Sequence, residues 1–540
     1  MPLTPDMRRS IDQIRDYLFG GGYPDPVSNA EQLSFLFFFY LVEGIDAENA
    51  LRAKVLKTPH TSLFEGAWEV KNPLNAIGGQ AHLPRSHFKW STWAKALSGE
   101  ALVRFVRDEV FAFYGEMGEG AAHNFMRGAR LAIDEPTVLT QVVNLVDGLR
   151  LDQSDADTKG DLFEHVLRQI KQAGELGQFR TPRHIIRRIV EMLDPKVGET
   201  VYDPAAGTAG FLVAAYNHMR LAHSSPSAIS EAEVDGKLQR RGLGDRLSAP
   251  QVSALQKATF FGNDVDPKMV RLATMNLTLR GLPNVAIQLR NVLTTTQDAE
   301  RKAELRLPEA GFHVILANPP FSGRVDKDRI VEDVKIGSST ATELLFLKYM
   351  LDALRPGGRA AVIVPEGVLF GSTGAHKELR RQLVENHRVE AVLSLPGGVF
   401  QPYSGVKTSV LFFRKGGNTE RVLFLHADAD GYKMDANHDT PVDADDLPAL
   451  AQAYAEREAR AAQWDARDTA ADWKDLWWFA DAATLRANDF NLSASRYRPM
   501  SQSQVAHHDP RVLLDELAAI EAELAEEVEA LRAALAESSI

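Results

Sequence analysis

The sequence predicts an α/β protein with a mainly parallel sheet, an N-terminal helical domain and a C-terminal helical extension. Three patterns predict this fold class. From residue 200 onward, short apolar runs alternate with helical stretches, as in the strand–helix units of a parallel sheet. Residues 1–150 instead carry apolar residues three or four positions apart, which is the spacing of helices. From Asp509 the helical spacing returns and continues to the end of the chain.

Length and pattern divide the chain into four parts. With 540 residues it is too long for a single hydrophobic core. We expect an N-terminal helical domain at 1–150, an α/β domain at 151–416, a peripheral extension at 417–508 and a C-terminal helix at 509–540. The N-terminal domain carries no catalytic motif, and the extension is rich in acidic residues and tryptophan.

Composition excludes several kinds of chemistry. The chain has no cysteine, so disulfides, thiolate metal sites and cysteine nucleophiles are impossible, and we expect no metal. The longest apolar run, residues 33–42, is far shorter than the ~20 residues needed to cross a bilayer. The N-terminus shows no signal-peptide pattern. We therefore expect a cytoplasmic protein without membrane contact.

Short apolar runs give the strand candidates of the α/β domain. They lie at 200–202, 259–263, 285–289, 313–317, 359–364, 389–393 and 408–413. Ligands of parallel sheets bind at the carboxyl ends of the strands. The segments that carry chemistry follow such strand ends, and the polar stretch 322–340 is a candidate lid or clamp beside them.

The strongest signal is Asn318-Pro319-Pro320-Phe321, directly after the strand candidate 313–317. This set suits methylation of the amino group of adenine, a poor nucleophile because its lone pair is delocalised into the ring. An asparagine oxygen and a backbone carbonyl aimed by proline can accept both amino hydrogens. An aromatic ring can stack on a base flipped from the duplex, which contributes ~1–3 kcal/mol. The plainer alternative is a proline turn with a core phenylalanine.

The second signal is the segment Asp-Pro-Ala-Ala-Gly-Thr-Ala-Gly-Phe at 203–211, between the first strand candidate and a helix. Small residues let the backbone approach a ligand closely. The segment is not a phosphate-binding loop, because it lacks the Gly-Lys-Ser/Thr ending. Taken alone, a tight strand–helix turn without a ligand explains it equally well.

The third signal is acidic and follows the second strand candidate. Asp264 could accept hydrogen bonds from both hydroxyls of a ribose. Asp266 is expected to cap the next helix, which is compatible with that role. Asn291 follows the third strand candidate and could bind the adenine edge of a cofactor.

Together these segments resemble the amino-methyltransferases of DNA and, more closely, the modification subunits of type I restriction–modification systems. The resemblance covers roughly residues 5–500. Besides 203–211 and 318–321 it rests on Gly-Gln-Phe-Arg-Thr-Pro (177–182), Arg-Pro-Gly-Gly-Arg-Ala-Ala-Val (355–362), Leu-Pro-Gly-Gly-Val-Phe (395–400), Gly-Val-Lys-Thr-Ser-Val-Leu-Phe-Phe (405–413) and Asn-Leu-Ser-Ala-Ser-Arg-Tyr (491–497). It implies a Rossmann-like sheet that binds S-adenosylmethionine, with 151–416 as the methyltransferase catalytic domain for N6 of adenine.

The resemblance also implies roles for single residues. The cofactor-binding set would be Gly177, Gln178, Phe179, Arg180, Thr181 and Pro182, then Asp203, Gly207, Thr208, Ala209 and Gly210, with Asp264 on the ribose and Asn291 on the adenine. Asn318 and Pro319 would hold the target amino group, Pro320 completes the motif, and Phe321 would stack on the base. Arg180 departs from the aromatic residue usual in the family, which puts its role in doubt. Ala209 replaces a common glycine, a change that we expect to be tolerated.

The partners implied by the resemblance are double-stranded DNA, a specificity subunit flanked by two copies of this chain, and a restriction/translocase subunit. The net charge of −12 is consistent with the need for partners, because a protein that held DNA alone through phosphate contacts would usually be basic. The narrow apolar stripe at 513–535 is the candidate helix that docks on the specificity subunit. The alternative is that this helix folds back on its own catalytic domain.

Other functions stay open at this point. A solitary DNA adenine methyltransferase is the main alternative. Enzymes that methylate a glutamine amide share the tetrapeptide type but are shorter and lack segments such as 395–413, and an RNA adenine methyltransferase is a further alternative. A cytosine-C5 methyltransferase is excluded, because that reaction needs a cysteine nucleophile. The intact Asn318 and Asp264 disfavour an inactive scaffold.

Overall fold

The computed structural model describes most of the chain from residue 4 to residue 499. The gaps within this range are 57–60, 117–124, 127, 173–180, 235, 402–403, 436–437, 439 and 467–475. Contacts divide the chain into two units, Met1–Tyr497 and Arg498–Ile540. Apart from the four helical positions Ala518, Glu521, Leu524 and Val528, the predicted C-terminal helix lies outside the described residues.

A nine-stranded sheet forms the centre of the first unit, within the part of the chain that is described. Its order is β15-β12-β10-β11-β9-β8-β3-β6-β7. The strands are β3 (Val201–Asp203), β6 (Phe260–Asp264), β7 (Ala286–Leu289), β8 (Phe312–Ala317), β9 (Leu354–Pro365), β10 (Arg388–Ser394), β11 (Thr408–Arg414), β12 (Arg421–His426) and β15 (Trp477–Asp481). Each predicted strand is present, and the run from β7 to β9 is parallel throughout. The predicted α/β class is therefore confirmed.

The chain changes direction across the sheet at β3. This strand pairs in parallel with β6 on one side and with β8 on the other, so that Val201 lies opposite Phe260 and Val314. In doubly wound sheets a ligand crevice opens at the carboxyl ends of strands that flank such a point. The loops that begin at Asp203, Asp264 and Asn318 all emerge there.

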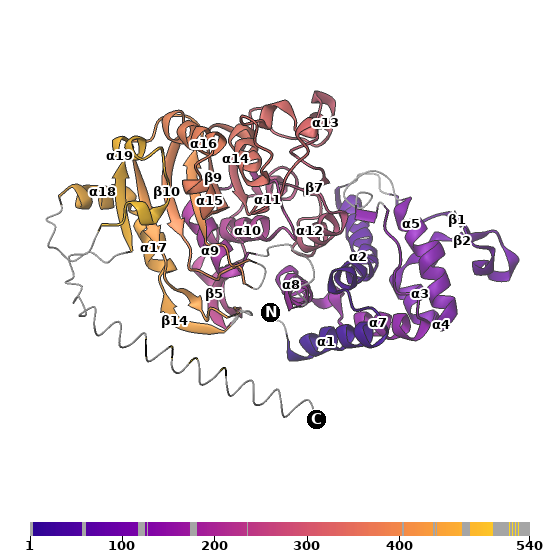
Figure 1. Ribbon diagram of the computed structural model, residues 1–540. Helices are drawn as coiled ribbons and strands as arrows, with labels where there is room; N and C mark the ends of the chain where they lie inside the picture. The colour runs from indigo at the N-terminus through magenta and orange to yellow at the C-terminus, as the bar shows by residue number, and fades with distance from the viewer. Residues whose placement is uncertain are drawn as a thin grey trace. The chain divides into compact units, whose positions relative to one another are not determined.

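Both faces of the sheet are covered by helices (Figure 1). Residues of β8 alternate between the two cores: Val314 and Leu316 face one, while Ile315 and Ala317 face the other. The first core includes residues of α9 (Arg183–Leu193), α10 (Gly210–Ala222) and α17 (Leu447–Ala455). The second includes residues of α14 (Thr342–Ala353), α15 (Glu366–Phe370), α16 (Gly374–Glu385) and α19 (Ala482–Ala487). Burial on both faces explains why the strands of this mainly parallel sheet are short and mostly apolar in sequence.

The N-terminal region is helical, as its spacing predicts. Its helices are α1 (Pro5–Gly20), α2 (Pro26–Leu56), α3 (Trp90–Ala96), α4 (Gly99–Phe105), the π-helix η4 (Val106–Val110), α5 (Phe111–Gly115) and α7 (Pro136–Gly148). They share a core with α8 (Ala156–Gln172) and with one face of α12 (Pro267–Leu279), through residues such as Leu272. An ion pair of 2.5 Å between Arg271 of α12 and Glu31 of α2 also joins these two helices. A short hairpin, β1 (Ala67–Glu69) with β2 (His82–Pro84), was not predicted, because three-residue strands leave almost no alternation to recognise.

The extension after β11 completes the sheet and adds a small layer beside it. The strands β12 and β15 extend the edge next to β10, and Trp478 is fully buried there. A hairpin of β13 (Asp430–Tyr432) and β14 (Pro441–Asp445) precedes α17 and α18 (Arg457–Asp465). Residues 225–256, polar in sequence, form the hairpin β4 (Ile229–Val234) and β5 (Lys237–Gly242) and then α11 (Ala249–Lys257).

The segments between the remaining strands are short. Helix α13 (Ala299–Glu304) precedes β8, and the polar stretch 322–340 contains the 3-10 turns η7 (Lys327–Arg329) and η8 (Glu332–Val334). A bridge between Arg324 and Ala341 closes this stretch at its ends. No helix in the described ranges is long and apolar enough to cross a membrane.

Candidate active site

The tetrapeptide Asn318–Phe321 leaves the carboxyl end of β8 at the sheet crevice. Asn318 is half-buried, Pro319 is buried and Pro320 is exposed. The Nδ2 atom of Asn318 donates a hydrogen bond of 2.9 Å to the hydroxyl oxygen of Thr181. With Nδ2 facing Thr181, the Oδ1 atom of the amide faces away from Thr181. The orientation of the asparagine is thus set by a residue from a distant part of the chain.

Thr181 and Pro182 place the start of α9 against the tetrapeptide. Thr181 is buried, and Pro182 is the N-cap residue of the helix, with φ −55° and ψ 140°. A proline suits this position because its φ is fixed near the value that a helix start requires. The other four residues predicted in this motif, Gly177, Gln178, Phe179 and Arg180, lie outside the described residues.

The small-residue segment after β3 forms a tight turn into α10. Gly207 has φ 52°, and a Cβ added there would meet no atom within 4 Å, so this side of the turn is open. Ala209 has φ 65° and serves as the N-cap residue of α10. A residue with a Cβ loses roughly 1–2 kcal/mol in this left-handed region. At this position a glycine would be free of strain, so the replacement of the common glycine by Ala209 carries a conformational cost.

Two carboxyl groups stand at the ends of the neighbouring strands β3 and β6. Burial, with the nearby Asp264 adding to it, raises the pKa of the Asp203 carboxyl to about 8. Burial is also the main cause that raises the pKa of Asp264. The Asp264 carboxylate accepts hydrogen bonds of 2.9 Å from the backbone N–H groups of Gly207 and Asp266. It therefore ties the turn after β3 to the start of α12.

Asn291 lies two residues after β7 and shapes the next turn. Its Oδ1 accepts a hydrogen bond of 3.0 Å from the backbone of Leu293, and its carbonyl accepts one of 3.0 Å from Thr295. The neighbouring Arg290 N–H donates to the carbonyl of Asp264 over 2.8 Å. This hydrogen bond joins the end of β6, which carries the predicted ribose contact Asp264, to the segment after β7, which carries the predicted adenine contact Asn291.

Phe321 is buried in the core beside the catalytic loop. Its ring meets that of Phe400 edge to face, with 5.1 Å between centroids and 88° between planes. Phe400 belongs to the Leu-Pro-Gly-Gly-Val-Phe segment at 395–400, so the fold brings two of the recognised motifs together. One edge of the site is therefore aromatic and apolar.

A cleft of about 630 Å³ opens beside these loops. Six of the predicted site residues line it: Thr181, Asp203, Gly207, Thr208, Gly210 and Asn318. The lining does not include Pro182, Ala209, Asp264, Asn291, Pro319, Pro320 or Phe321. The volume falls in the range of small-molecule sites. Together with the open side of Gly207 and the polar groups at the strand ends, it fits a nucleoside-sized cofactor.

Several lining residues were not foreseen from the sequence. Asn276 of α12 is buried and donates a hydrogen bond of 2.8 Å to the carbonyl of Thr208, which supports the small-residue turn from behind. Within the described residues its Oδ1 has no hydrogen-bond partner. An asparagine between apolar residues of a buried helix was the available signal for this role.

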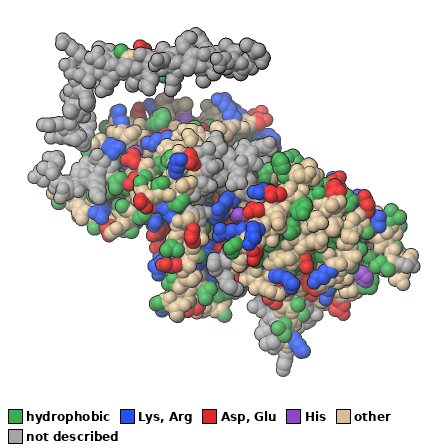
Figure 2. All heavy atoms as spheres, turned by 90° about the horizontal axis from the view of Figure 1, so that it is seen from below, with side chains coloured by type: hydrophobic (Ala, Val, Ile, Leu, Met, Phe, Trp, Pro, Cys, Tyr) green, Lys and Arg blue, Asp and Glu red, His purple; other side chains and the backbone are tan. Residues whose placement is uncertain are grey.

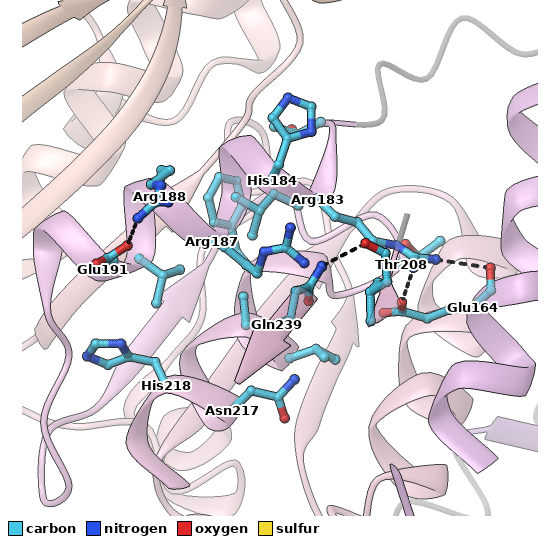
Figure 3. A pocket seen from close by; sticks show the side chains of 18 of the residues that line it. Glu164, Arg183, His184, Arg187, Arg188, Glu191, Thr208, Asn217, His218 and Gln239 are labelled. Atoms are coloured by element: carbon cyan, nitrogen blue, oxygen red, sulfur yellow. Dashed lines mark hydrogen bonds and ion pairs between the residues drawn. The ribbon is translucent and has the colours of Figure 1, made fainter. Parts of the chain in front are cut away.

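Charged side chains of both signs line the cleft, and most of its arginines are paired with acidic residues. In Figure 3, Arg183, Arg187 and Arg188 lie along the part of the wall that α9 forms, with Asn217 and His218 below them. Arg183 pairs with Glu164 over 2.8 Å, and Arg188 pairs with Glu191 over 2.5 Å. Figure 2 shows Lys and Arg side chains gathered near the middle of the face seen from below. An acidic chain can therefore still present a locally basic surface.

Comparison with known proteins bears on this geometry. The family model described as N-6 DNA Methylase matches residues 154–506, more than half of the chain and all of the loops described above. The chain belongs to the N-6 DNA methylase family. It is thus an adenine-specific DNA methyltransferase that uses S-adenosylmethionine, and the resemblance seen in the motifs is confirmed.

Two relatives show how far the similarity extends. The methylase subunit of the type I restriction enzyme EcoEI from Escherichia coli is 29% identical over 81% of this chain and 84% of its own length. The EcoKI methylase subunit from Escherichia coli K12 is 32% identical over 63% of this chain and 60% of its own length. The chain therefore matches less than two thirds of the EcoKI relative.

Solved structures agree on the fold. A chain from a structural study of assembly in the type I restriction–modification system covers 98% of this chain with a TM-score of 0.66 at 24% identity. The methyltransferase subunit of the type I system from Streptococcus thermophilus covers 91% with a TM-score of 0.61 at 17% identity. At these identities the likeness supports the fold, and the predicted Rossmann-like methyltransferase sheet is confirmed.

Proposed function

We propose that this N-6 DNA methylase works as the modification subunit of a type I restriction–modification complex. Two copies would flank one specificity subunit on double-stranded DNA, and a restriction/translocase subunit would join them. The names of the relatives support this assembly, because they are methylase subunits of type I restriction enzymes. The net charge of −12 supports it too, since DNA affinity then has to come largely from partners. The cytoplasmic location stays a prediction.

The cofactor would lie across the carboxyl ends of β3, β6 and β7. Thr181, Thr208 and Gly210 would contact its amino-acid part, in line with their place on the cleft wall. Asp264 would hold the ribose, and Asn291 would hold the adenine. Asp203, beneath the turn, would place a carboxyl group on the cleft wall beside the cofactor. When bound, the cofactor supplies an electrophilic methyl group on its sulfonium.

Asn318 is the residue on which catalysis would depend, and its contact with Thr181 is the observation that carries the proposal. Because Nδ2 donates to Thr181, the Oδ1 end is the one that would accept hydrogen from the adenine amino group. The carbonyl of Pro319 would accept the second hydrogen. Both contacts keep electron density on N6 as it gains the methyl group and releases a proton. The chain needs no covalent intermediate for this step.

Phe321 would supply the stacking surface for the flipped base. Its ring is buried and packs perpendicular to the ring of Phe400, so we propose that this aromatic pair rearranges when the base enters. Stacking worth ~1–3 kcal/mol would offset much of the few kcal/mol that base flipping costs.

Reconstitution tests this proposal against a solitary methyltransferase. The full chain is assayed for methyl transfer to DNA alone and together with a specificity subunit from the same source. The proposal predicts weak, unspecific DNA binding by the chain alone, and methylation of a defined site only with the partner. Efficient methylation of a defined site by the chain alone would replace the complex with a solitary enzyme.

A further inference from the structure

A second cluster of chemically active side chains lies at the edge of the cleft. His184, at the start of α9, and Asp430 and His438, from the extension, converge there although they are far apart in the sequence. One ligand atom from each lies within 4.8 Å of the others. None of the three belongs to the motifs of the methylase.

The carboxylate of Asp430 is the centre of this cluster. Its Oδ2 lies 2.8 Å from Nε2 of His184 and 2.9 Å from Nε2 of His438. The backbone N–H of Tyr432 donates to Oδ1 over 3.2 Å, which fixes the rotation of the carboxylate. Two imidazole nitrogens and one carboxylate oxygen therefore point at one small volume. In tetrahedral sites with bonds near 2.0–2.1 Å, ligand atoms are ~3.3 Å apart. The two N–O distances are about half an ångström shorter than this and all three ligand atoms lie within 4.8 Å of one another, so the side chains would have to adjust their rotamers to admit an ion.

Charge balance also favours a cation in this cluster. The side chain of Asp430 is fully buried, and that of His438 is 1% exposed. Among the described residues, the ion pairs of Asp430 are with the two histidines and include no lysine or arginine. Lys237 of the neighbouring hairpin places its ammonium group beside Gly431 and 5.0 Å from the centroid of the Tyr432 ring, but its ion pair is with Asp445 over 3.0 Å. A buried carboxylate is costly without compensating charge, and a divalent ion would provide it.

The backbone and rings around the cluster hold the ligands in place. His438 has φ 45°, a conformation uncommon for a residue with a side chain. The ring of His184 stacks on Tyr432 with centroids 4.3 Å apart. His184 and Asp430 also line the cleft, which gives an ion a path to the site, and Figure 3 shows His184 at its upper edge.

We propose that His184, Asp430 and His438 bind a divalent transition-metal ion, with zinc the best match to two imidazoles and one carboxylate. The ion would be structural. It would join the start of α9 to the extension, and α9 begins two residues after Thr181, whose hydroxyl orients Asn318. A metal-free triad, in which both rings donate hydrogen bonds to the carboxylate, is the alternative.

Zinc titration of the full chain tests the site. Protein stripped with a chelator is titrated with Zn²⁺ by calorimetry, and bound metal is measured by mass spectrometry. We expect one ion per chain, a thermal midpoint that rises when zinc is added, and visible absorption of the Co²⁺-substituted protein. Asp430→Asn keeps the shape and the hydrogen-bond acceptor but should weaken binding by more than about 100-fold, beyond the effect of removing an outer-shell partner. His438→Gln should weaken zinc binding to a similar extent.

A matched control exists in the same cleft. His218 lies 2.8 Å from Asp194 but belongs to no group of three possible metal ligands among the described residues, so His218→Gln should leave zinc binding unchanged. Circular dichroism confirms that each variant is folded. The proposal is overturned if the stripped wild-type chain binds no stoichiometric zinc, or if Asp430→Asn and His438→Gln bind it as tightly as wild type. These readouts do not depend on methylation, so they fail separately from the proposed function.

Discussion

The side-chain amide of Asn318 donates a hydrogen bond of 2.9 Å to the hydroxyl of Thr181, which lies 137 residues earlier in the chain. The contact joins the motif at 177–182 to the tetrapeptide at 318–321. It also decides which end of the amide faces Thr181 and which end faces away. The orientation of the proposed catalytic group is therefore a property of two loops held by different elements, β8 and α9.

Replacing Thr181 tests this positioning. Thr181→Val keeps the shape of the side chain but removes the acceptor, so the amide of Asn318 loses its fixed orientation. A hydrogen bond contributes about 0.5–1.5 kcal/mol, so the single-turnover rate of methylation should fall by about 2–10-fold. Thr181→Ser restores the hydroxyl and should recover most of the rate. A Thr181→Val enzyme as fast as wild type would show that this contact does not orient the catalytic group.

The cofactor assignment predicts a different response at Asp264. Asp264→Ala removes a charged acceptor and should weaken binding of S-adenosylmethionine by about 1.5–3 kcal/mol, measured by calorimetry. Asp266→Ala is the matched control, because that residue caps α12 through a hydrogen bond of 2.8 Å to Lys268. It should cost about 1 kcal/mol of stability and leave the affinity unchanged. Equal affinities in the Asp264 variant and wild type would place the ribose elsewhere.

Asp203 predicts a pH dependence of stability. Its pKa in the folded chain is about 8, above the ordinary value of 3.8, because the carboxyl is buried. The folded state therefore favours the protonated acid. The stabilising contribution of the Asp203 carboxyl to the free energy of unfolding is fully present below its unfolded pKa of 3.8. It is lost as the pH rises from there through the folded pKa of about 8. Between these limits the loss is on the order of 1 kcal/mol per pH unit.

Urea unfolding of Asp203→Asn measures this contribution. The amide cannot ionise but can still accept the hydrogen bond from Ala205. Between about pH 6 and about pH 8, the wild-type chain should lose stability more steeply than the variant. Asp298→Asn, a change at an exposed helix cap, should keep the wild-type slope. Parallel slopes for wild type and Asp203→Asn would contradict a protonated Asp203.

Truncation after Pro499 tests the role of the C-terminal helix. Residues Met1–Tyr497 form one compact unit, so the shortened chain should fold and bind the cofactor with unchanged affinity. If the stripe at 513–535 docks on the specificity subunit, the shortened chain should no longer co-purify with it or methylate DNA. A truncated chain that assembles and methylates normally would remove this helix from the interface.

The strands of the sheet could be predicted because they are buried on both faces. Runs such as 313–317 and 408–413 are mainly apolar, with polar residues only at their starts, and both are strands of the central sheet. The hairpin Ile229–Val234 with Lys237–Gly242 was not predicted, since its strands are polar and mostly exposed or half-buried. The strands β12 and β15 lay in a region read from composition as an extension, and the structure pairs them with the sheet edge.

The site was predictable where its residues are contiguous in sequence. The loops at 203–211 and 318–321 each carry their own signal. Partners brought in by the fold carry none: Asn276 supports the turn at Thr208, and Asp430 meets His184 from 246 residues away. Such pairs depend on the order of strands and helices, which local patterns do not contain.

The central claim is that this chain methylates N6 of adenine through Asn318. Single-molecule sequencing of genomic DNA measures it most directly, in cells that carry the partner subunits with the wild-type chain, with Asn318→Ala, or with no chain. Asn386→Ala, a change at the end of α16, controls for the loss of an asparagine elsewhere. The account predicts N6-methyladenine at one recognition sequence with wild type and Asn386→Ala, and none with Asn318→Ala although that variant still binds S-adenosylmethionine. Wild-type levels of the mark with Asn318→Ala, or no mark with the wild-type chain, would contradict it.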